Sequence, residues 1–337
     1  MKTWSASLVH VACIAVVLLG CAGPQQGAPP RTVAPPGSPV ALHGRLRACG
    51  NRICDQHGKP VQLRGMNFFW SNTGWGGERF FQAQAVDTLV DQWHATLVRA
   101  ALGIQNDGGW QVDREGNEAR VRAVVDAAIA RGIYVIVDWH SHALLEKEAV
   151  EFFSRWAAEY KDAPNVIWET FNEPKRHDWI EELVPYHQAV IKAIRKAGSR
   201  NLVVLGTPAW SQDVDSAALD PVTSDKNIAY ALHFYAATHK QSLRDKADFA
   251  LKQGVPIMVT EWGSCNADAD GTIDVAETKR WLDWMDKNQV SSANWSLNDK
   301  REAASALVPG APAGGWTDAH LTPSGVLARE YISAGAR

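Results

Sequence analysis

The sequence predicts an α/β protein built as a (β/α)8 TIM barrel, with an N-terminal β-hairpin that closes the bottom of the barrel. Short β-rich runs alternate with longer runs of helical period along most of the 337 residues. Eight such β-rich runs are present, and eight parallel strands close a barrel. A doubly wound open sheet is the alternative. That fold usually carries a glycine-rich phosphate loop after its first strand, where this chain has Met66-Asn67-Phe68-Phe69-Trp70.

Residues 1–20 have the features of a signal peptide. Lys2 supplies a positive charge, and Val11 to Leu19 form an apolar run too short to span a membrane. The following Leu18-Leu19-Gly20-Cys21 resembles a bacterial lipobox, in which Cys21 is lipidated and becomes the first residue. This predicts an exported protein anchored to the cell envelope by lipid, at the outer membrane in a Gram-negative host, or released outside the cell. An ordinary secretory signal with cleavage nearby remains the alternative.

Residues 21–42 are rich in Pro, Gly and Gln and lack apolar periodicity, which predicts a tether between the lipidated cysteine and the folded domain. The barrel domain is expected over residues 43–337. It begins with a hairpin over Leu46–Asp55, which turns at Gly50-Asn51. Cys49 and Cys54 flank this turn, and an oxidising compartment favours a disulfide between them over two free thiols. No cysteine or histidine spacing indicates a metal site.

The barrel elements follow in order. The expected strands are Val61–Phe69, Thr96–Leu102, Tyr134–Trp139, Val166–Asn172, Leu202–Gly206, Ile228–Tyr235, Ile257–Glu261 and Ser292–Leu297. Apolar residues at three- and four-residue spacing predict helices over Arg120–Arg131, Ala149–Tyr160, Trp179–Ala197, Leu243–Lys252 and Val275–Asn288. Gly132, Gly198 and Gly254 end three of these helices, as glycines after a helix commonly do.

The net charge and the tryptophan content of the chain indicate which classes of binding partner to expect. The formal net charge is −3 and no basic block stands out, so we expect no nucleic-acid partner. Tryptophan is abundant, with 15 copies. Roughly half should pack in the core. The flat apolar faces of those beside strand ends suit the C–H faces of a sugar ring.

Polar and aromatic side chains gather where the expected strands end, and in a barrel these ends meet over one pocket. They are Arg99, Asp138, His140, His142, Asn172, Glu173, His233, Tyr235, Glu261 and Trp295. Taken singly, each is explained by solvation or a structural hydrogen bond. Six strands that deliver such groups to one face are hard to explain by core packing. Arg99 interrupts an apolar run, so a buried carboxylate is expected beside it.

Glu173 and Glu261 end strands four and seven, which lie on opposite walls of a barrel, so we expect the two carboxyl groups to face one another. Breaking a glycosidic bond requires such a pair, one protonated and one ionised. Hydrogen bonds from Arg99 and Tyr235 are expected to keep Glu261 ionised, and the neighbouring anion is expected to keep Glu173 protonated.

The chain resembles glycoside hydrolase family 5, and within it the bacterial endoglucanases (cellulases) of the second subfamily. The resemblance extends from about Leu46 to Ser333. It rests on Leu63-Arg64-Gly65-Met66, Val98-Arg99-Ala100-Ala101, Ile136-Val137-Asp138-Trp139-His140-Ser141-His142, Asn172-Glu173-Pro174, Trp210-Ser211-Gln212-Asp213-Val214, His233-Phe234-Tyr235, Glu261-Trp262-Gly263, Ala293-Asn294-Trp295-Ser296-Leu297 and Gly314-Gly315-Trp316-Thr317. The departure is Phe68-Phe69-Trp70-Ser71-Asn72, which replaces a histidine-containing loop of some relatives and leaves the minus-side subsites open.

The resemblance implies roles for residues that match the family motifs. Glu173 resembles the general acid/base and Glu261 the nucleophile. Arg99, His140, Asn172, His233 and Tyr235 resemble the groups around the substrate. Trp295 resembles the platform under the sugar beside the scissile bond, and Trp70 and Trp210 resemble more distant platforms. Lys300 and Glu302 resemble polar contacts on the non-reducing side.

The activity implied is that of a retaining endo-β-1,4-glucanase, which hydrolyses internal bonds of cellulose and related β-glucans by double displacement. The resemblance implies no cofactor and no catalytic metal, and we expect a monomer. An endo-β-glycanase acting on mannan, xyloglucan, lichenan or chitosan is the alternative. A lipoprotein that binds polysaccharide without cleaving it is a further alternative, although it would not require both carboxylates.

Overall fold

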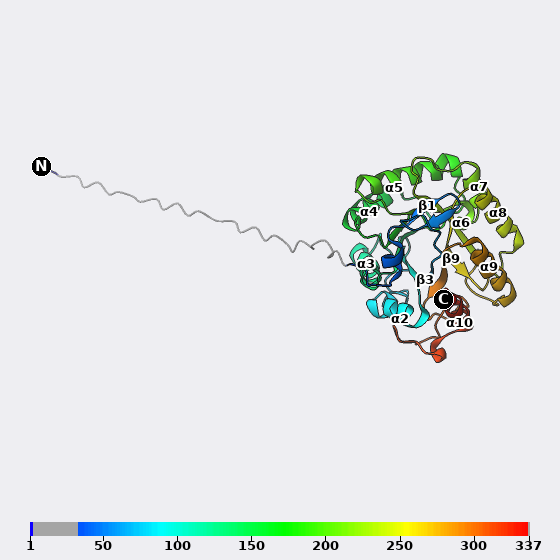
Figure 1. Cartoon of the computed structure of the whole chain (residues 1–337). Helices are drawn as coiled ribbons and strands as arrows, with labels where there is room; N and C mark the ends of the chain where they lie inside the picture. Colours follow the sequence, from blue (N-terminus) through cyan, green and yellow to red (C-terminus); the bar gives the residue numbers. More distant parts are fainter. Residues whose placement is uncertain (3–32, 336–337) are drawn as a thin grey trace.

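The computed structural model describes residues 1–2 and 33–335, arranged around one barrel (Figure 1). Residues 3–20 of the expected signal peptide, the lipobox cysteine Cys21 and residues 22–32 of the tether lie outside these described residues. Within them, no helix has the length and apolar character needed to cross a membrane.

Eight parallel strands close the barrel in the order β10-β3-β4-β5-β6-β7-β8-β9. Their bounds are β3 (Arg64–Phe68), β4 (Leu97–Gly103), β5 (Tyr134–His140), β6 (Val166–Glu169), β7 (Val203–Leu205), β8 (Ile228–Tyr235), β9 (Ile257–Gly263) and β10 (Ser292–Leu297). The predicted fold class is thus confirmed. Strand four is shorter than expected, because Asn172 and Glu173 already belong to the loop after β6. That loop carries the two side chains out over the end of the barrel.

Helices form a ring around the strands when the barrel is viewed along its axis (Figure 1). The α-helices are α1 (Pro39–His43), α2 (Ala83–Trp93), α3 (Arg114–Arg131), α4 (Glu146–Glu159), α5 (Val184–Lys196), α6 (Pro208–Ser211), α7 (Val214–Leu219), α8 (Gln241–Lys252), α9 (Val275–Asn288) and α10 (Pro323–Ala334). A π-helical turn, η2 (Trp179–Leu183), precedes α5, and two 3₁₀ turns are η1 (Glu78–Phe80) and η3 (Asp318–His320). The predicted helix over 179–197 is therefore two elements, joined before Pro185.

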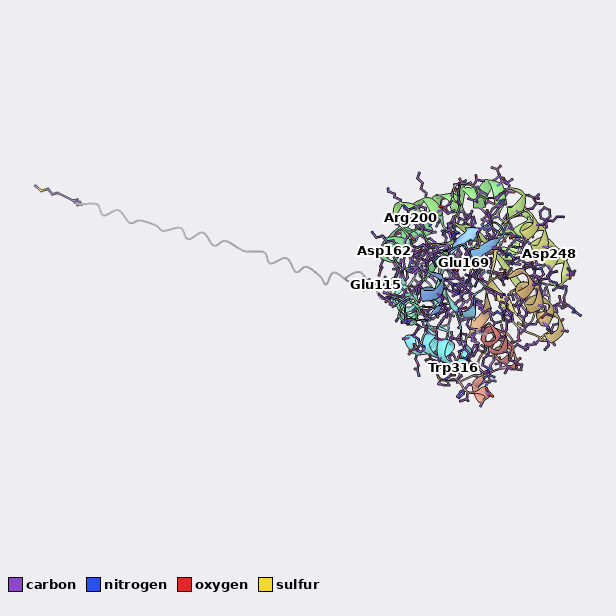
Figure 2. All side chains as sticks on the ribbon, viewed as in Figure 1. Glu115, Asp162, Glu169, Arg200, Asp248 and Trp316 are labelled. Carbon is purple, nitrogen blue, oxygen red and sulfur yellow. A yellow bond between two sulfur atoms is a disulfide. The ribbon has the colours of Figure 1, made fainter. Side chains whose placement is uncertain are left out.

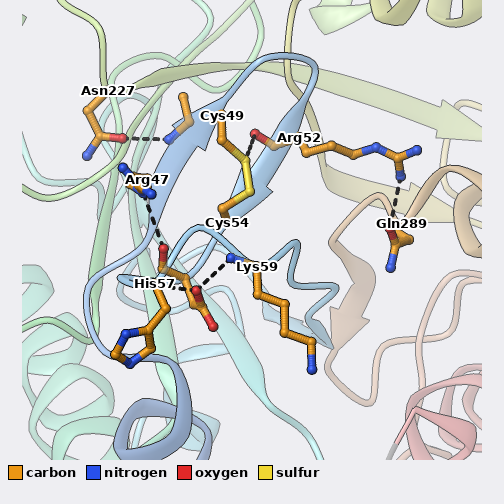
Figure 3. Close-up of a disulfide and its surroundings, with 10 residues drawn as sticks. Arg47, Cys49, Arg52, Cys54, His57, Lys59, Asn227 and Gln289 are labelled. Carbon is orange, nitrogen blue, oxygen red and sulfur yellow. Dashed lines mark hydrogen bonds between the residues drawn. A yellow bond between two sulfur atoms is a disulfide. The ribbon is translucent and has the colours of Figure 1, made fainter.

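A disulfide-linked hairpin lies across the amino-terminal end of the barrel. It pairs β1 (Arg47–Cys49) with β2 (Arg52–Cys54), and Cys49 and Cys54 are bonded, with their Cα atoms 6.0 Å apart (Figure 3). The Ala48 amide donates to Asn227 Oδ1 at 2.8 Å, just before β8. Arg52 reaches Gln289 Oε1 at 3.3 Å, just after α9. The hairpin is thus fastened to two sides of the ring.

The described residues form three buried apolar clusters, of which the smallest includes Phe69, Tyr235 and Trp295. The largest lies between strands and helices and includes Trp139, Trp156 and Trp168. The second lies inside the barrel, where Leu46 and Ile53 of the hairpin pack with Ile167 and Met258. The buried polar side chains of Arg99, Asp138 and Glu169 lie inside the barrel as well.

Candidate active site

A cavity of about 640 Å³ opens at the carboxyl end of the strands. Ten of the predicted site residues line it: Trp70, His140, His142, Glu173, Trp210, His233, Tyr235, Glu261, Trp295 and Glu302. Arg99 and Asn172 are buried behind the cavity wall, and Lys300 lies at its margin beside Glu302. The structure therefore brings the predicted set to one place, but Arg99 and Asn172 support the lining residues instead of lining the cavity themselves.

The two predicted catalytic carboxylates face one another across this cavity. Glu173 comes from the loop after β6 and Glu261 from within β9. One oxygen of each lies, together with a ring nitrogen of His233, in a group whose atoms are all within 4.8 Å of one another. Retaining glycosidases place their two carboxyl groups about 5–5.5 Å apart, and inverting enzymes about 6.5–9.5 Å apart. The nearest oxygens of Glu173 and Glu261, at most 4.8 Å apart, lie closer than the spacing of inverting enzymes.

Two side chains hold the Glu261 carboxylate in place. The Tyr235 hydroxyl donates to Oε1 at 2.7 Å, and Arg99 donates to Oε2 at 3.3 Å. Tyr235 takes this position because it lies over Gly263. A Cβ on Gly263 would sit 2.4 Å from the Tyr235 ring. A side chain at position 263 would thus displace the ring that orients Glu261.

Arg99 is the centre of the buried polar network. Its guanidinium bonds Glu169 at 2.6 Å, Asp138 at 2.9 Å and Glu261 at 3.3 Å. It also donates to Asn67 Oδ1 at 2.8 Å and to Asn172 Oδ1 at 2.7 Å. The carboxylate expected beside Arg99 is confirmed, and there are three of them. Figure 2 shows Glu169 in the middle of the barrel, seen along its axis.

Glu173 differs from the expectation that it holds the proton of the pair. His142 Nε2 lies 3.1 Å from its Oε2, and His233 Nδ1 lies 2.9 Å from its Oε1. Burial raises the pKa of Glu173, but these two hydrogen bonds outweigh it and lower the pKa to about 2. Burial lowers the pKa of His233, but Glu261, Glu169 and Glu173 outweigh it and raise the pKa to about 9. The contact between the two side chains therefore favours a proton on His233 in the free protein.

The pKa of Glu261 also departs from the expected direction. Burial raises it, and Glu173 adds to the increase, against the lowering effects of His233, Arg99 and Tyr235. The contacts from Arg99 and Tyr235 are those predicted, yet an ionised Glu173 nearby opposes them. Removal of this second negative charge, when Glu173 is protonated, favours the ionised form of Glu261.

His140 and two tryptophans form the floor of the cavity. His140 Nδ1 bonds Asp138 Oδ2 at 2.6 Å, which fixes the ring. Its plane is stacked on Trp295, with centroids 5.2 Å apart and 5° between the planes, and Trp70 meets its edge at 4.2 Å. Burial, with the nearby Arg99 charge, lowers the pKa of His140 well below its ordinary value, so the ring is neutral. A flat apolar surface of this kind suits one face of a sugar.

Trp210 lies on a left-handed turn at the cavity, with its ring centroid 5.3 Å from that of His142, and is 43% exposed. Ala209, Trp210 and Ser211 all have φ between 54° and 65°, a region that is unfavourable for residues other than glycine. Hydrogen bonds to the segment that carries Glu173 hold the turn. The Trp210 amide donates to the Pro174 carbonyl at 2.8 Å, and Ser211 Oγ donates to the Asn172 carbonyl at 2.7 Å. Trp210 and Glu173 are therefore fixed relative to one another.

The cavity contains residues that the sequence argument did not assign. Gln212, His239, Asp268 and Phe69 line it. Lys300 Nζ lies 4.4 Å from the Phe69 ring centroid and 3.1 Å from Glu302. Glu169 and Thr260 belong to the network behind the wall. Glu169 could have been found by the signal that identified Arg99, since it too is a charged residue in an apolar run.

Glu173, His233 and Glu261 also have the spacing of a possible cation site among the described residues. Each of these donor atoms already has a partner: Glu173 Oε1 and His233 Nδ1 bond each other, and Glu261 Oε2 bonds Arg99. We assign these residues no metal role.

A parallel barrel that holds two carboxylates at this separation over an aromatic-lined cavity defines the class of barrel glycosidases. The family model for cellulase, glycosyl hydrolase family 5, matches residues 54–301. The chain belongs to this family.

Its relatives carry endoglucanase names. The chain is 46% identical to Endoglucanase Z of Dickeya dadantii over 291 residues, covering 86% of this chain and 66% of that protein. It is 44% identical to Endoglucanase A of Evansella cellulosilytica, covering 83% of this chain and 58% of that one. The chain thus spans less than two thirds of the length of these curated relatives.

Solved structures agree in fold. A structure from Cytophaga hutchinsonii superposes with a TM-score of 0.85 at 43% identity, covering 88% of this chain and 97% of that one. The catalytic domain of a Thermobifida fusca endoglucanase gives 0.83 at 31% identity, covering 88% and 99%.

Proposed function

We propose that the protein is a retaining endo-β-1,4-glucanase of the second subfamily, which hydrolyses internal bonds of cellulose and related β-glucans. The observation that carries the proposal is the approach of the Glu173 and Glu261 oxygens to within 4.8 Å over the cavity. The endoglucanase names of the relatives support the substrate class.

The reaction proceeds in two displacements. Glu261, oriented by Tyr235 and Arg99, attacks the anomeric carbon while Glu173 gives a proton to the departing oxygen. A covalent glycosyl-enzyme results. Glu173 then takes a proton from water, and the water oxygen replaces Glu261 at the same carbon. Two inversions restore the original configuration.

Binding follows from the lining of the cavity. The stacked His140 and Trp295 lie beside the carboxylate pair and suit the sugar next to the scissile bond. Trp70 and Trp210 extend the aromatic surface through His142, whose ring centroid lies 5.5 Å from that of Trp70 and 5.3 Å from that of Trp210. Asn172 accepts a hydrogen bond from Arg99 behind the cavity wall, and Lys300 with Glu302 supplies polar contacts on the non-reducing side. The endoglucanase names of the relatives support action on internal bonds of the chain.

Variants of the two carboxylates test the roles. Glu173→Ala and Glu261→Ala are each expected to lose several orders of magnitude in kcat on barley β-glucan and carboxymethylcellulose, because members of a catalytic unit act together. Proton NMR of the first product should show the β-anomer. Wild-type rates in either variant, or an α-anomer as first product, would contradict the assignment. A panel with mannan, xyloglucan, lichenan and chitosan defines the polymer.

We further propose export as a lipoprotein anchored through Cys21, on the basis of Leu18-Leu19-Gly20-Cys21 after the apolar run. Palmitate labelling of the expressed full chain should be lost in Cys21→Ser, while Cys13→Ser serves as the matched control. Labelling that persists in Cys21→Ser would contradict the anchor. We also propose that the protein works as a monomer, which sedimentation of the released domain will test.

A further inference from the structure

A chain of buried hydrogen bonds runs from Arg99 to Glu173. Arg99 Nε donates to Glu169 Oε2 at 2.6 Å, and Thr260 Oγ1 donates to Glu169 Oε1 at 2.6 Å. Thr260 Oγ1 lies 2.9 Å from His233 Nε2, and His233 Nδ1 lies 2.9 Å from Glu173 Oε1. Glu169 and Thr260 are completely buried, so no solvent competes for these bonds.

The number of protons on these side chains determines which atom donates in each hydrogen bond of the chain. Burial raises the pKa of Glu169, but Arg99 outweighs it and the pKa lies below its ordinary value, so Glu169 is an anion that only accepts. The single hydroxyl proton of Thr260 therefore points to Glu169. The Thr260 oxygen is left to accept, and its remaining neighbour is His233 Nε2. His233 must accordingly carry a proton on Nε2.

This direction determines what faces Glu173. With Nε2 protonated, His233 Nδ1 either carries a second proton and donates it to the Glu173 carboxylate, or is bare and accepts one from the Glu173 carboxyl group. In both cases, one proton lies between the two atoms. In the opposite tautomer, a neutral ring carries its only proton on Nδ1. That proton would lie in the hydrogen bond to Glu173 Oε1, but a neutral imidazole does not give it up for catalysis.

We propose that Thr260 and Glu169 are positioning residues that hold His233 in its Nε2–H form, so that His233 and Glu173 share the proton delivered to the leaving group. The inference rests on the proposed function and extends it to two residues that do not line the cavity. The acid that acts in the reaction is then the His233–Glu173 pair, and the pair as a whole sets the upper pH limit.

The His233–Glu173 pair loses one proton and regains one proton in each turnover. In the first step, the glycosidic C–O bond breaks, the bond from C1 to Glu261 forms, and the departing hydroxyl leaves with the proton of the pair. In the second step, water forms its bond to C1, Glu261 is released, and the proton from water returns to Glu173. It is then shared again with His233.

The charges around His233 come from several strands. Glu173 follows β6 at 2.9 Å, Glu169 of β6 lies at 3.9 Å, and Glu261 of β9 lies at 4.0 Å. The remaining titratable or charged groups of the network are Arg99 on β4, Asp138, His140 and His142 on or after β5, and Tyr235 on β8. The acidic groups nearest the ring favour the imidazolium, and Thr260 supplies the acceptor that its Nε2–H requires.

Two substitutions at one position test the proposal. Thr260→Val keeps the shape but removes the acceptor, so the imidazolium loses stability and the pair loses its proton at lower pH. We expect kcat/KM at about pH 9, relative to about pH 6, to fall roughly tenfold below the wild-type ratio, with KM little changed. Thr260→Ser keeps the hydroxyl and should restore the wild-type profile. An unshifted upper limb in Thr260→Val, or an equal shift in Thr260→Ser, would overturn the proposal.

A second measurement needs no variant at Thr260. Nitrogen-15 NMR of wild-type protein labelled at histidine, with His233→Gln to identify the signal, reports the proton on each ring nitrogen. Nε2 should remain protonated across the titration, while Nδ1 loses its proton. A neutral His233 with the proton on Nδ1 would contradict the proposal. Absence of hydrolysis on every β-glucan would instead contradict the proposed function, and the NMR result would still decide the state of His233.

Discussion

At the scale of single residues, Arg99 shows how one buried cation organises several acids. Lysine carries the same charge but lacks the planar fork that reaches several acceptors at once. Arg99→Lys leaves buried acids without a partner, and breaking a buried pair costs about 3–5 kcal/mol. We expect a corresponding loss in the free energy of unfolding, measured with urea, and a loss of kcat of at least about 100-fold.

The matched control is Arg114→Lys. Arg114 pairs with Glu151 at 2.7 Å on the surface, where both side chains are 47% exposed. Exposed pairs contribute about 0–1 kcal/mol, so this variant should unfold like the wild type. If the free energy of unfolding falls equally in Arg99→Lys and Arg114→Lys, the buried network around Arg99 contributes no more to stability than an exposed ion pair.

The pH profile belongs to the same residues. Activity requires ionised Glu261 and a proton in the His233–Glu173 pair, so kcat/KM should be bell-shaped. The pKa of Glu261 is raised, so the acid limb lies above the ordinary range of a glutamate, and activity falls as pH drops through it. The pKa of His233 is about 9, so the other limb falls as pH rises through that value. A profile flat on either side would contradict these roles.

At the scale of elements, most strands and helices follow from apolar spacing, and some were missed although their signals are present. Helix α2 buries Ala85, Val86, Leu89 and Trp93, which have helical spacing. Helix α10 begins with Thr322 as its cap and Pro323 in its first turn. The turn at Ala209–Ser211 is a different case. Three left-handed residues in succession go against local preference, and contacts with residues 172–175, distant in sequence, help to hold them, so sequence periodicity could not predict the turn.

Helix α5 carries a histidine that couples stability to pH. His187 is completely buried, bonded to Thr170 Oγ1 and to the Gly206 carbonyl, each at 2.9 Å. Burial lowers its pKa to about 4, against about 6.5 in an unfolded chain. The folded state therefore favours neutral His187. This stabilisation is complete above pH 6.5 and is lost as pH falls toward 4, on the order of 3 kcal/mol.

Urea unfolding at pH 7 and pH 5 measures this effect. In His187→Gln, the difference in free energy of unfolding between the two pH values should be smaller than in the wild type. His57→Gln, at an exposed position of the hairpin region, should leave the difference unchanged. A wild-type difference in His187→Gln would assign the acid sensitivity to other groups.

At the scale of the whole molecule, alternation of strands and helices was sufficient to predict the barrel. The strand-end pattern predicted seven of the side chains that line the cavity, namely His140, His142, Glu173, His233, Tyr235, Glu261 and Trp295, while Trp70, Trp210 and Glu302 were expected from the family resemblance. The sequence could not predict how far below the cavity surface each side chain lies. Sequence places Arg99 and Glu261 at the same end of the barrel, but it does not show that one lies behind the other. The protonation of Glu173 was misjudged for the same reason, because the contact with His233 joins elements 60 residues apart.

The hairpin disulfide should contribute to stability without affecting catalysis. Its half-cystines are five residues apart, so loop-closure entropy gives about 2 kcal/mol. Cys49→Ser/Cys54→Ser is expected to lower the free energy of unfolding by about that amount and to leave kcat and KM unchanged, since the hairpin covers the end of the barrel opposite the cavity. Cys265→Ser, at a buried free cysteine, separates this effect from thiol loss in general. A changed kcat in the double variant would contradict this independence.

The partners of Arg99 come from β3, β5, β6 and β9, which meet only when the ring of strands is complete. A partly folded barrel therefore lacks the complete Arg99 network, and we expect it to have no partial activity. The residual rate of hydrolysis in a heated or denatured sample should then be proportional to the fraction of molecules that remain folded. An assay of sugar release would therefore measure that fraction.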